Sequence, residues 1–179
     1  MSAMFSYPVT AVVPADTAAD FDEALPLLHA YAEWLQSVIG LPPAERQPDL
    51  RREFSDPASM YSPPRGRMLL GRVGSLVRGV VCVRVDETGV AELKRMYVTP
   101  AARGLGAGRA LLDAAVTTAS GLGFRVLQLQ TRPADMAVEH RLYRERGFLE
   151  IDGYADLGIE GVCSLALALD RRVGSAGAR

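Results

Sequence analysis

The part of the chain best suited to chemistry is a glycine-rich segment, Arg103-Gly-Leu-Gly-Ala-Gly108, between a predicted strand and a predicted helix. The first N–H groups of a helix have no partner within the helix, and the helix dipole places partial positive charge there. Glycine lets an anion approach these N–H groups closely. The segment is therefore a candidate site for a pyrophosphate group.

The spacing of the glycines argues against two common nucleotide sites. A P-loop needs a lysine and a hydroxyl residue after its last glycine, whereas Arg109 and Ala110 follow Gly108 here. A dinucleotide-binding loop needs its third glycine one position later. The preceding strand also carries Glu92, Lys94 and Arg95, which do not suit a buried parallel strand. Two interpretations stay open: an acyl-CoA cradle of the form Arg-x-x-Gly-x-Gly, or glycines that only permit tight packing.

Two blocks of sequence, residues 92–112 and 142–148, together favour the acyl-CoA cradle. In these blocks and in their order, the chain resembles the GNAT superfamily of acyl-CoA-dependent N-acyltransferases over residues 8–169. The resemblance implies acetyl-CoA as the acyl donor. It also implies that the backbone of Met96 faces the thioester oxygen and that Val98 pairs with the pantetheine arm. The residues that would hold the pyrophosphate are Arg103, Gly104, Leu105, Gly106, Ala107 and Gly108.

Acylation of an amine needs a base, because only on the order of 0.1% of a lysine-like amine is unprotonated at neutral pH. Glu92 is a candidate, since a carboxylate within a half-buried strand is out of place unless it is solvated, ion-paired or functional. The leaving thiolate needs a proton donor, and the resemblance places Tyr143 beside the sulfur. Tyr143 is also the residue that we expect to pack against the cofactor.

The acceptor site is less well marked by the sequence. The resemblance implies that it is walled by the early helices, the loop before the second strand and the segment after the sixth strand. We expect the acceptor to contact Tyr61, Arg65, Arg95 and Tyr154. An arginine among them could hold a carboxylate through two hydrogen bonds.

The pattern of apolar and turn-forming residues predicts one α/β domain over residues 1–179, with a core at 8–169 and a frayed tail at 171–179. We expect a mixed, mostly antiparallel sheet of six to seven strands, flanked by helices, with the fourth and fifth strands splayed apart. The predicted strands cover residues 8–13, 67–73, 76–85, 90–98, 124–131, 148–151 and 161–169. The predicted helices cover 27–39, 48–54 and 134–146, together with a helix from the glycine run to Gly121. Pro26 starts the first helix or kinks a longer one, and residues 55–66 form an ordered loop.

The charge balance, 20 basic against 21 acidic residues, argues against nucleic acid or an anionic membrane as a partner. The two cysteines belong to no metal-binding motif, so we expect free thiols and no metal. The sequence lacks an apolar run of the roughly 18 residues that a membrane helix needs, and we expect a cytoplasmic protein. The predicted function is transfer of an acetyl group from acetyl-CoA to a primary amine of a small molecule or peptide, with homodimerisation a further expectation. The alternative is an acyl-CoA-binding sensor without catalysis.

Overall fold

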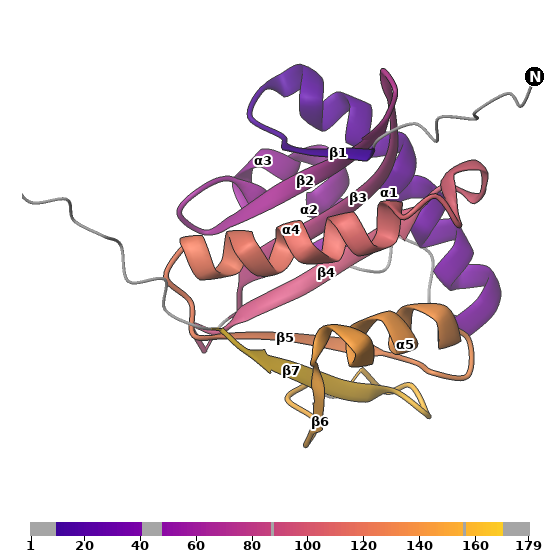
Figure 1. Ribbon diagram of the computed structural model, residues 1–179, viewed down its shortest axis with the longest axis vertical. Coiled ribbons are helices and arrows are strands. Elements are labelled where there is room, and N and C mark those ends of the chain that lie inside the picture. The colour runs from indigo at the N-terminus through magenta and orange to yellow at the C-terminus, as the bar shows by residue number, and fades with distance from the viewer. Residues whose placement is uncertain (1–9, 41–47, 87, 156, 170–179) are drawn as a thin grey trace, which may run out of the picture.

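The computed structural model describes residues 10–40, 48–86, 88–155 and 157–169, and these build a seven-stranded sheet in the order β1-β2-β3-β4-β5-β7-β6. Neighbouring strands are antiparallel except for β4 and β5, which are parallel. Figure 1 shows the helices on both faces of this sheet. The strands are β1 (Thr10–Pro14), β2 (Gly66–Val73), β3 (Leu76–Val85), β4 (Ala91–Val98), β5 (Val126–Thr131), β6 (Leu149–Ile151) and β7 (Cys163–Ala168). The predicted α/β class and mostly antiparallel sheet are confirmed.

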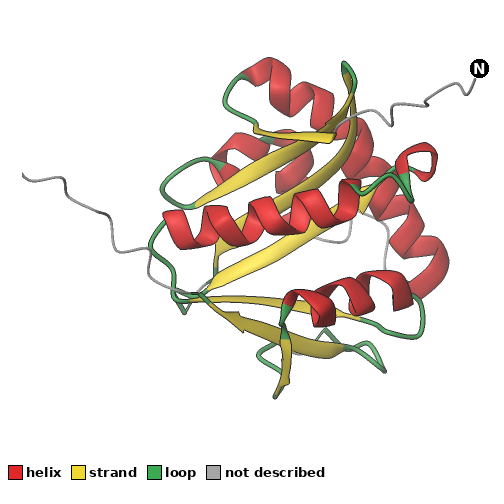
Figure 2. Cartoon of the chain, viewed as in Figure 1, coloured by secondary structure: helices red, strands yellow, loops and turns green. Residues whose placement is uncertain are grey.

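Two hydrophobic cores lie on opposite faces of the sheet, because successive side chains of a strand point to opposite sides. On β2, Leu69 packs in the core under α4 (Ala107–Gly121), while Met68 and Leu70 pack in the core under α1 (Ala18–Ile39). Figure 2 shows α4 crossing in front of the central strands. Both faces of the central sheet are therefore covered, and its open edges lie at β1 and β6.

The first helix begins earlier than the apolar pattern predicts. The Thr17 hydroxyl oxygen accepts a hydrogen bond from the backbone N–H of Asp20, and the Asp20 carboxylate accepts one from the backbone N–H of Thr17. These two bonds form a capping box, which fixes the start of α1. Pro26 lies within the helix rather than at its start. Gly40, at φ 70°, ends the helix as predicted.

The segment before the second strand is partly helical, so the prediction of a loop over residues 55–66 is wrong in part. The helix α2 (Pro48–Ser55) agrees with the prediction, and a short helix, α3 (Pro57–Tyr61), follows it. Asp56 caps α3 by accepting a hydrogen bond from the N–H of Ser59, and Pro57 occupies the first turn. The Asp-Pro pair is thus a helix-start signal here.

The chain crosses from β4 to β5 through a 3-10 turn, η2 (Pro100–Ala102), and α4. A second helix, α5 (Ala137–Arg146), follows β5 and ends at Gly147, where φ is 103°. This strand-helix-strand order is the predicted crossover. Within the described residues, no helix is long and apolar enough to span a membrane. The predicted strand start at Pro8 and the predicted tail at 171–179 lie outside the described residues.

Candidate active site

The strands β4 and β5 pair over only two positions, Ala91 with Leu127 and Glu92 with Gln128. Beyond Glu92 the two strands diverge, as Figure 1 shows. The predicted splay between the fourth and fifth strands is therefore present. It leaves the edge of β4 that faces β5 without a strand partner beyond this point, so a ligand can approach the backbone there.

A bulge interrupts β4 beside the opening. Cys82 of β3 pairs with Lys94 and Val80 pairs with Tyr97, so β4 carries one extra residue between these positions. Arg95 adopts a left-handed backbone, with φ at 56°, which is costly for a residue with a side chain. The bulge changes the direction of the backbone immediately before Met96, the residue expected to face the thioester.

The segment after β4 contains the glycines that the sequence predicts to form a cradle. Gly104 and Gly106 have φ values of 75° and 82°, which favour glycine. A Cβ atom at either position would meet no atom within 4 Å, so the glycines serve the backbone conformation and leave open space beside it. Gly106 is the N-cap of α4 and offers no side chain to the first N–H groups of that helix. These groups are suited to a pyrophosphate, which fits the expected acyl donor.

A cavity of about 880 Å³ joins the cradle to the splayed strands. It is lined by residues of α1, β4, the start of α4, β5 and α5. Of the residues predicted from the sequence, the lining includes Glu92, Arg95, Met96, Val98, Arg103, Gly104, Gly106, Gly108 and Tyr143. Leu105 is half-buried and Ala107 is buried beside this lining. The structure thus brings the two conspicuous blocks of the sequence, which lie far apart along the chain, to one cavity.

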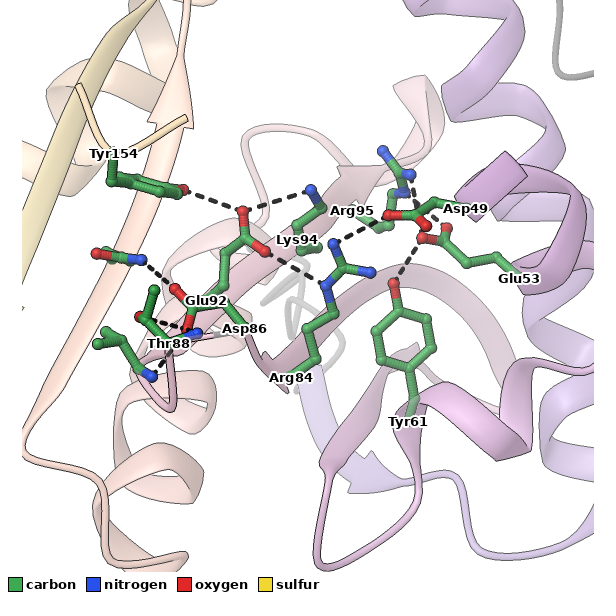
Figure 3. Close-up of polar contacts among 12 residues, drawn as sticks. Asp49, Glu53, Tyr61, Arg84, Asp86, Thr88, Glu92, Lys94, Arg95 and Tyr154 are labelled. Carbon is green, nitrogen blue, oxygen red and sulfur yellow. Dashed lines mark hydrogen bonds and ion pairs between the residues drawn. The ribbon is translucent and has the colours of Figure 1, made fainter. Parts of the chain in front are cut away.

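Glu92 lies in the wall of the cavity with 6% of its surface exposed. Its Oε1 accepts hydrogen bonds from the Tyr154 hydroxyl at 3.0 Å and from Lys94 Nζ at 3.4 Å. Its Oε2 accepts a hydrogen bond from Arg84 Nε at 3.3 Å. Figure 3 shows these donors converging on the carboxylate from three directions. The ion pair that the sequence left open for Glu92 is therefore formed, and its partners are Lys94 and Arg84.

Tyr143, on α5, lines the cavity, and only 6% of its surface is exposed. Its hydroxyl donates to Met96 Sδ at 3.6 Å, which places the phenol beside the bulge. Burial raises the pKa of Tyr143 well above its ordinary value, and Tyr31 and Glu139 act in the same direction. The hydroxyl therefore stays protonated at neutral pH and can donate a proton.

A buried ion pair between Arg95 and Glu53 holds the bulge against α2. The guanidinium of Arg95 donates to the Glu53 carboxylate through Nε at 2.6 Å and through Nη2 at 3.0 Å. Glu53, on α2, is fully buried and also accepts a hydrogen bond from the Tyr61 hydroxyl at 2.8 Å. Figure 3 shows Glu53 between Arg95 and Tyr61. The pair ties α2 and α3 to the bulged part of β4.

The four residues expected at the acceptor site are placed differently from one another. Arg95 lines the cavity, but Glu53 holds its guanidinium; Tyr154 reaches the site through its bond to Glu92. Among the described residues, Tyr61 is fully buried under the bulge and Arg65 is exposed on the turn before β2, and neither lines the cavity. Sequence reasoning missed Glu53, since no local signal distinguishes it from a solvated glutamate of an amphipathic helix.

The cavity also has an apolar wall. Tyr31 and Trp34 of α1 line it, together with Leu157, Ile159 and Val162 from the segment before β7. Tyr31 lies near both aromatic neighbours, with ring centroids 6.1 Å from Trp34 and 6.0 Å from Tyr97. In the described part of the chain, no group of three or more His, Cys, Asp or Glu side chains is placed to hold a metal ion.

Comparisons with known proteins agree with this geometry. An uncharacterized N-acetyltransferase of Schizosaccharomyces pombe is 30% identical over 121 residues, which cover 66% of this chain and 74% of that protein. Among solved structures, an acetyltransferase of the GNAT family from Staphylococcus aureus Mu50 has a TM-score of 0.70 at 16% identity, covering 90% of this chain and 100% of that one. The PaiA N-acetyltransferase from Thermoplasma acidophilum, solved in complex with coenzyme A, has a TM-score of 0.66 at 17% identity, covering 89% of this chain and 99% of that one.

The family model for the acetyltransferase (GNAT) family matches residues 28–148. This range is more than half of the chain, and it contains the bulged strand, the glycine cradle and Tyr143. With the splayed strands and the shared cavity, the match leads to one conclusion: the chain belongs to the acetyltransferase (GNAT) family.

Proposed function

We propose that the protein transfers the acetyl group of acetyl-CoA to a primary amine of a small molecule or peptide, by direct attack in a ternary complex. The observation that carries this proposal is the single cavity that joins the start of α4, the β4 bulge, Glu92 and Tyr143. Holding two reactants in one orientation supplies a large share of the acceleration of such a transfer.

The donor end of the cavity is the cradle. The N–H groups at the start of α4 and the side chain of Arg103 would hold the pyrophosphate, and the backbone of Val98 would pair with the pantetheine arm. Arg103 lies beside Val98, because its Nε donates to the carbonyl of Val98 at 3.2 Å. When bound, acetyl-CoA supplies an activated thioester.

The reacting groups of the chain then have distinct roles. Glu92 accepts a proton from the acceptor ammonium, directly or through a water molecule. The N–H of Met96 donates to the thioester oxygen, where negative charge develops. Tyr143, which like any tyrosine is protonated at neutral pH, gives a proton to the departing sulfur.

The acceptor end of the cavity combines an apolar wall with the Glu92 carboxylate. We infer an acceptor that carries a primary amine on a partly apolar body, since aromatic rings favour apolar surface and the carboxylate favours a cation. We retain the sequence-based expectations of a cytoplasmic location and of a homodimer as parts of this proposal.

A thermal-shift screen with acetyl-CoA, CoA and NAD tests the donor, because a ligand that binds the folded state raises the melting temperature. We expect stabilisation by acetyl-CoA and CoA; stabilisation by NAD alone would reject the proposal. A panel of amines with detection of the released thiol then tests transfer. Binding of acetyl-CoA with no release of thiol across the panel would instead favour the non-catalytic sensor.

A further inference from the structure

The chain contains a single lysine, Lys94, and the other residues in its Lys and Arg total of 20 are arginines. This lysine lies in the wall of the cavity that also contains the β4 bulge. It is two residues from Glu92 on the same strand, so both side chains leave the same face of β4. The only lysine in the sequence therefore lies in the wall of the cavity, beside the carboxylate proposed as the base.

The surroundings of Lys94 Nζ suit a nucleophile. The side chain is 22% exposed, and its contact with Glu92 Oε1 is long, at 3.4 Å. Figure 3 shows Nζ and the Glu92 carboxylate pointing toward one another. The ammonium is thus beside the carboxylate that the proposed mechanism uses to accept a proton.

Burial lowers the pKa of Lys94 below its ordinary value. The neighbouring cations Arg95 on β4 and Arg84 on β3 act in the same direction, while Glu92 on β4 and Glu53 on α2 oppose them. A larger fraction of this amine is therefore unprotonated at neutral pH than of an exposed lysine.

We propose that Lys94 is itself an acetyl acceptor, so that the protein acetylates its own cavity when no external amine is bound. Nζ forms an amide bond to the acetyl carbon, the bond from that carbon to the CoA sulfur breaks, and the electron pair leaves with the sulfur. Nζ reacts as the free amine, and its one displaced proton passes to Glu92. Tyr143 gives its hydroxyl proton to the thiolate, and the proton on Glu92 returns to Tyr143 through water. The product is acetyl-Lys94 and free CoA, with no other reactant.

This inference rests on the proposed function, because it uses acetyl-CoA as the donor. Acetylation removes the positive charge of Lys94, weakens its contact with Glu92 and places an amide in the acceptor end of the cavity. We therefore expect acetyl-Lys94 protein to bind CoA normally and to transfer acetyl groups to external amines more slowly.

The test is peptide mapping by mass spectrometry after incubation of the purified protein with acetyl-CoA alone. We expect one acetyl group on Lys94, no acetyl group at that position in Lys94→Arg, and slower modification in Glu92→Gln. The matched control is Arg125→Lys, which adds an exposed lysine at a position that does not line the cavity. Within that variant, Lys94 is expected to react on the order of a hundredfold faster than the added lysine, because the donor is held beside it.

The outcomes separate the two proposals. Equal acetylation of Lys94 and of the added lysine, or no acetylation of Lys94 in a protein that binds acetyl-CoA and acetylates an external amine, would overturn the role of Lys94 and leave the proposed function intact. A protein that does not bind acetyl-CoA would overturn both.

A second readout needs no CoA. Reductive methylation with ¹³C-formaldehyde labels the single lysine and the N-terminal amine. The Lys94 resonance is the one absent from Lys94→Arg, and it can be followed as a function of pH. We expect its titration midpoint to lie below that of the added lysine in Arg125→Lys. A midpoint at or above the control would contradict the view of Lys94 as an activated amine.

Discussion

Two carboxylates flank the β4 bulge, and their surroundings differ in kind. Glu53 is fully buried and accepts three hydrogen bonds of 2.6, 2.8 and 3.0 Å from Arg95 and Tyr61. Glu92 lines the cavity and accepts bonds of 3.0, 3.3 and 3.4 Å from Tyr154, Arg84 and Lys94. Figure 3 shows both groups, with the side chains of Arg84 and Asp49 drawn between them. The short, enclosed contacts favour a fixed geometry, and the longer contacts at an open wall favour a group that can exchange partners and protons.

The two carboxylates therefore have different roles: Glu53 of α2 supports the bulge of β4, and Glu92 of β4 is the reactive group. The left-handed backbone of Arg95 is costly and persists only where the surrounding structure holds it. Glu53 holds the side chain of that same residue, so we infer that α2 maintains the bulge. Glu92 then acts on a backbone that is already fixed.

The largest effect that we expect is on stability, in Glu53→Ala. Removing one partner leaves the Arg95 guanidinium buried without its counter-charge, which costs about 3–5 kcal/mol of the free energy of unfolding. Urea denaturation measures this loss. Glu92→Ala is the matched control, with an expected loss of about 1–2 kcal/mol, because its donors can turn to water in the cavity. Equal losses of stability in the two variants would contradict the view that Glu53 has the structural role and Glu92 does not.

Glu92→Gln, unlike Glu53→Ala, should change the activity strongly and the stability only slightly. A positioned general base contributes at least about a hundredfold, so we expect kcat/KM to fall by about that factor. Steady-state kinetics with an amine found in the panel gives the value, and titration with CoA gives the control. If kcat/KM is retained, Glu92 has a structural role like that of Glu53.

Tyr143→Phe should lower kcat by about a hundredfold, with little change in CoA affinity, since only proton donation is lost. Its raised pKa means that the phenol stays protonated through the alkaline range in which an ordinary tyrosine ionises. Ionisation of Tyr143 should therefore cause no alkaline decline in the kcat of the wild-type protein, and the pH profile of Tyr143→Phe should have the same alkaline side. Such a decline, or unchanged kcat in the variant, would exclude Tyr143 as the acid.

Gly106→Ala tests the glycine cradle, and its expected effect, on the affinity for CoA, is the smallest of the four. A residue with a Cβ at φ 82° costs about 1–2 kcal/mol, and the strain falls at the start of α4. We expect CoA to bind up to about tenfold more weakly in an equilibrium titration, as such strain converts to affinity. Gly121→Ala, at the far end of α4 with open space around its Cβ, is the control. Equal affinities for CoA in the two variants would show that the conformation of Gly106 does not support binding.

Most of the fold follows from local sequence patterns. The apolar periodicity and the turn residues predicted the strands and the crossover, because these depend on neighbours in sequence. The start of α1 and the whole of α3 were missed, although Thr17 with Asp20 and the pair Asp56-Pro57 are local signals for helix starts.

The site was less predictable than the fold. Glu92, Tyr143 and the glycine segment, which the sequence motifs predicted to lie together, line one cavity in the structure. The bond between Glu53 and Arg95 joins residues 42 positions apart, and no spacing rule links them. We therefore expected Arg95 and Tyr61 to contact the acceptor, whereas in the structure both donate hydrogen bonds to the Glu53 carboxylate.

The central claim is that the cavity between the splayed strands holds acetyl-CoA, with its diphosphate at the start of α4. A crystal structure of the protein with acetyl-CoA tests it most directly. We predict diphosphate oxygens accepting hydrogen bonds from the first N–H groups of α4, and the sulfur between Met96 and the Tyr143 hydroxyl. A diphosphate bound elsewhere, with the start of α4 left to water, would contradict the account.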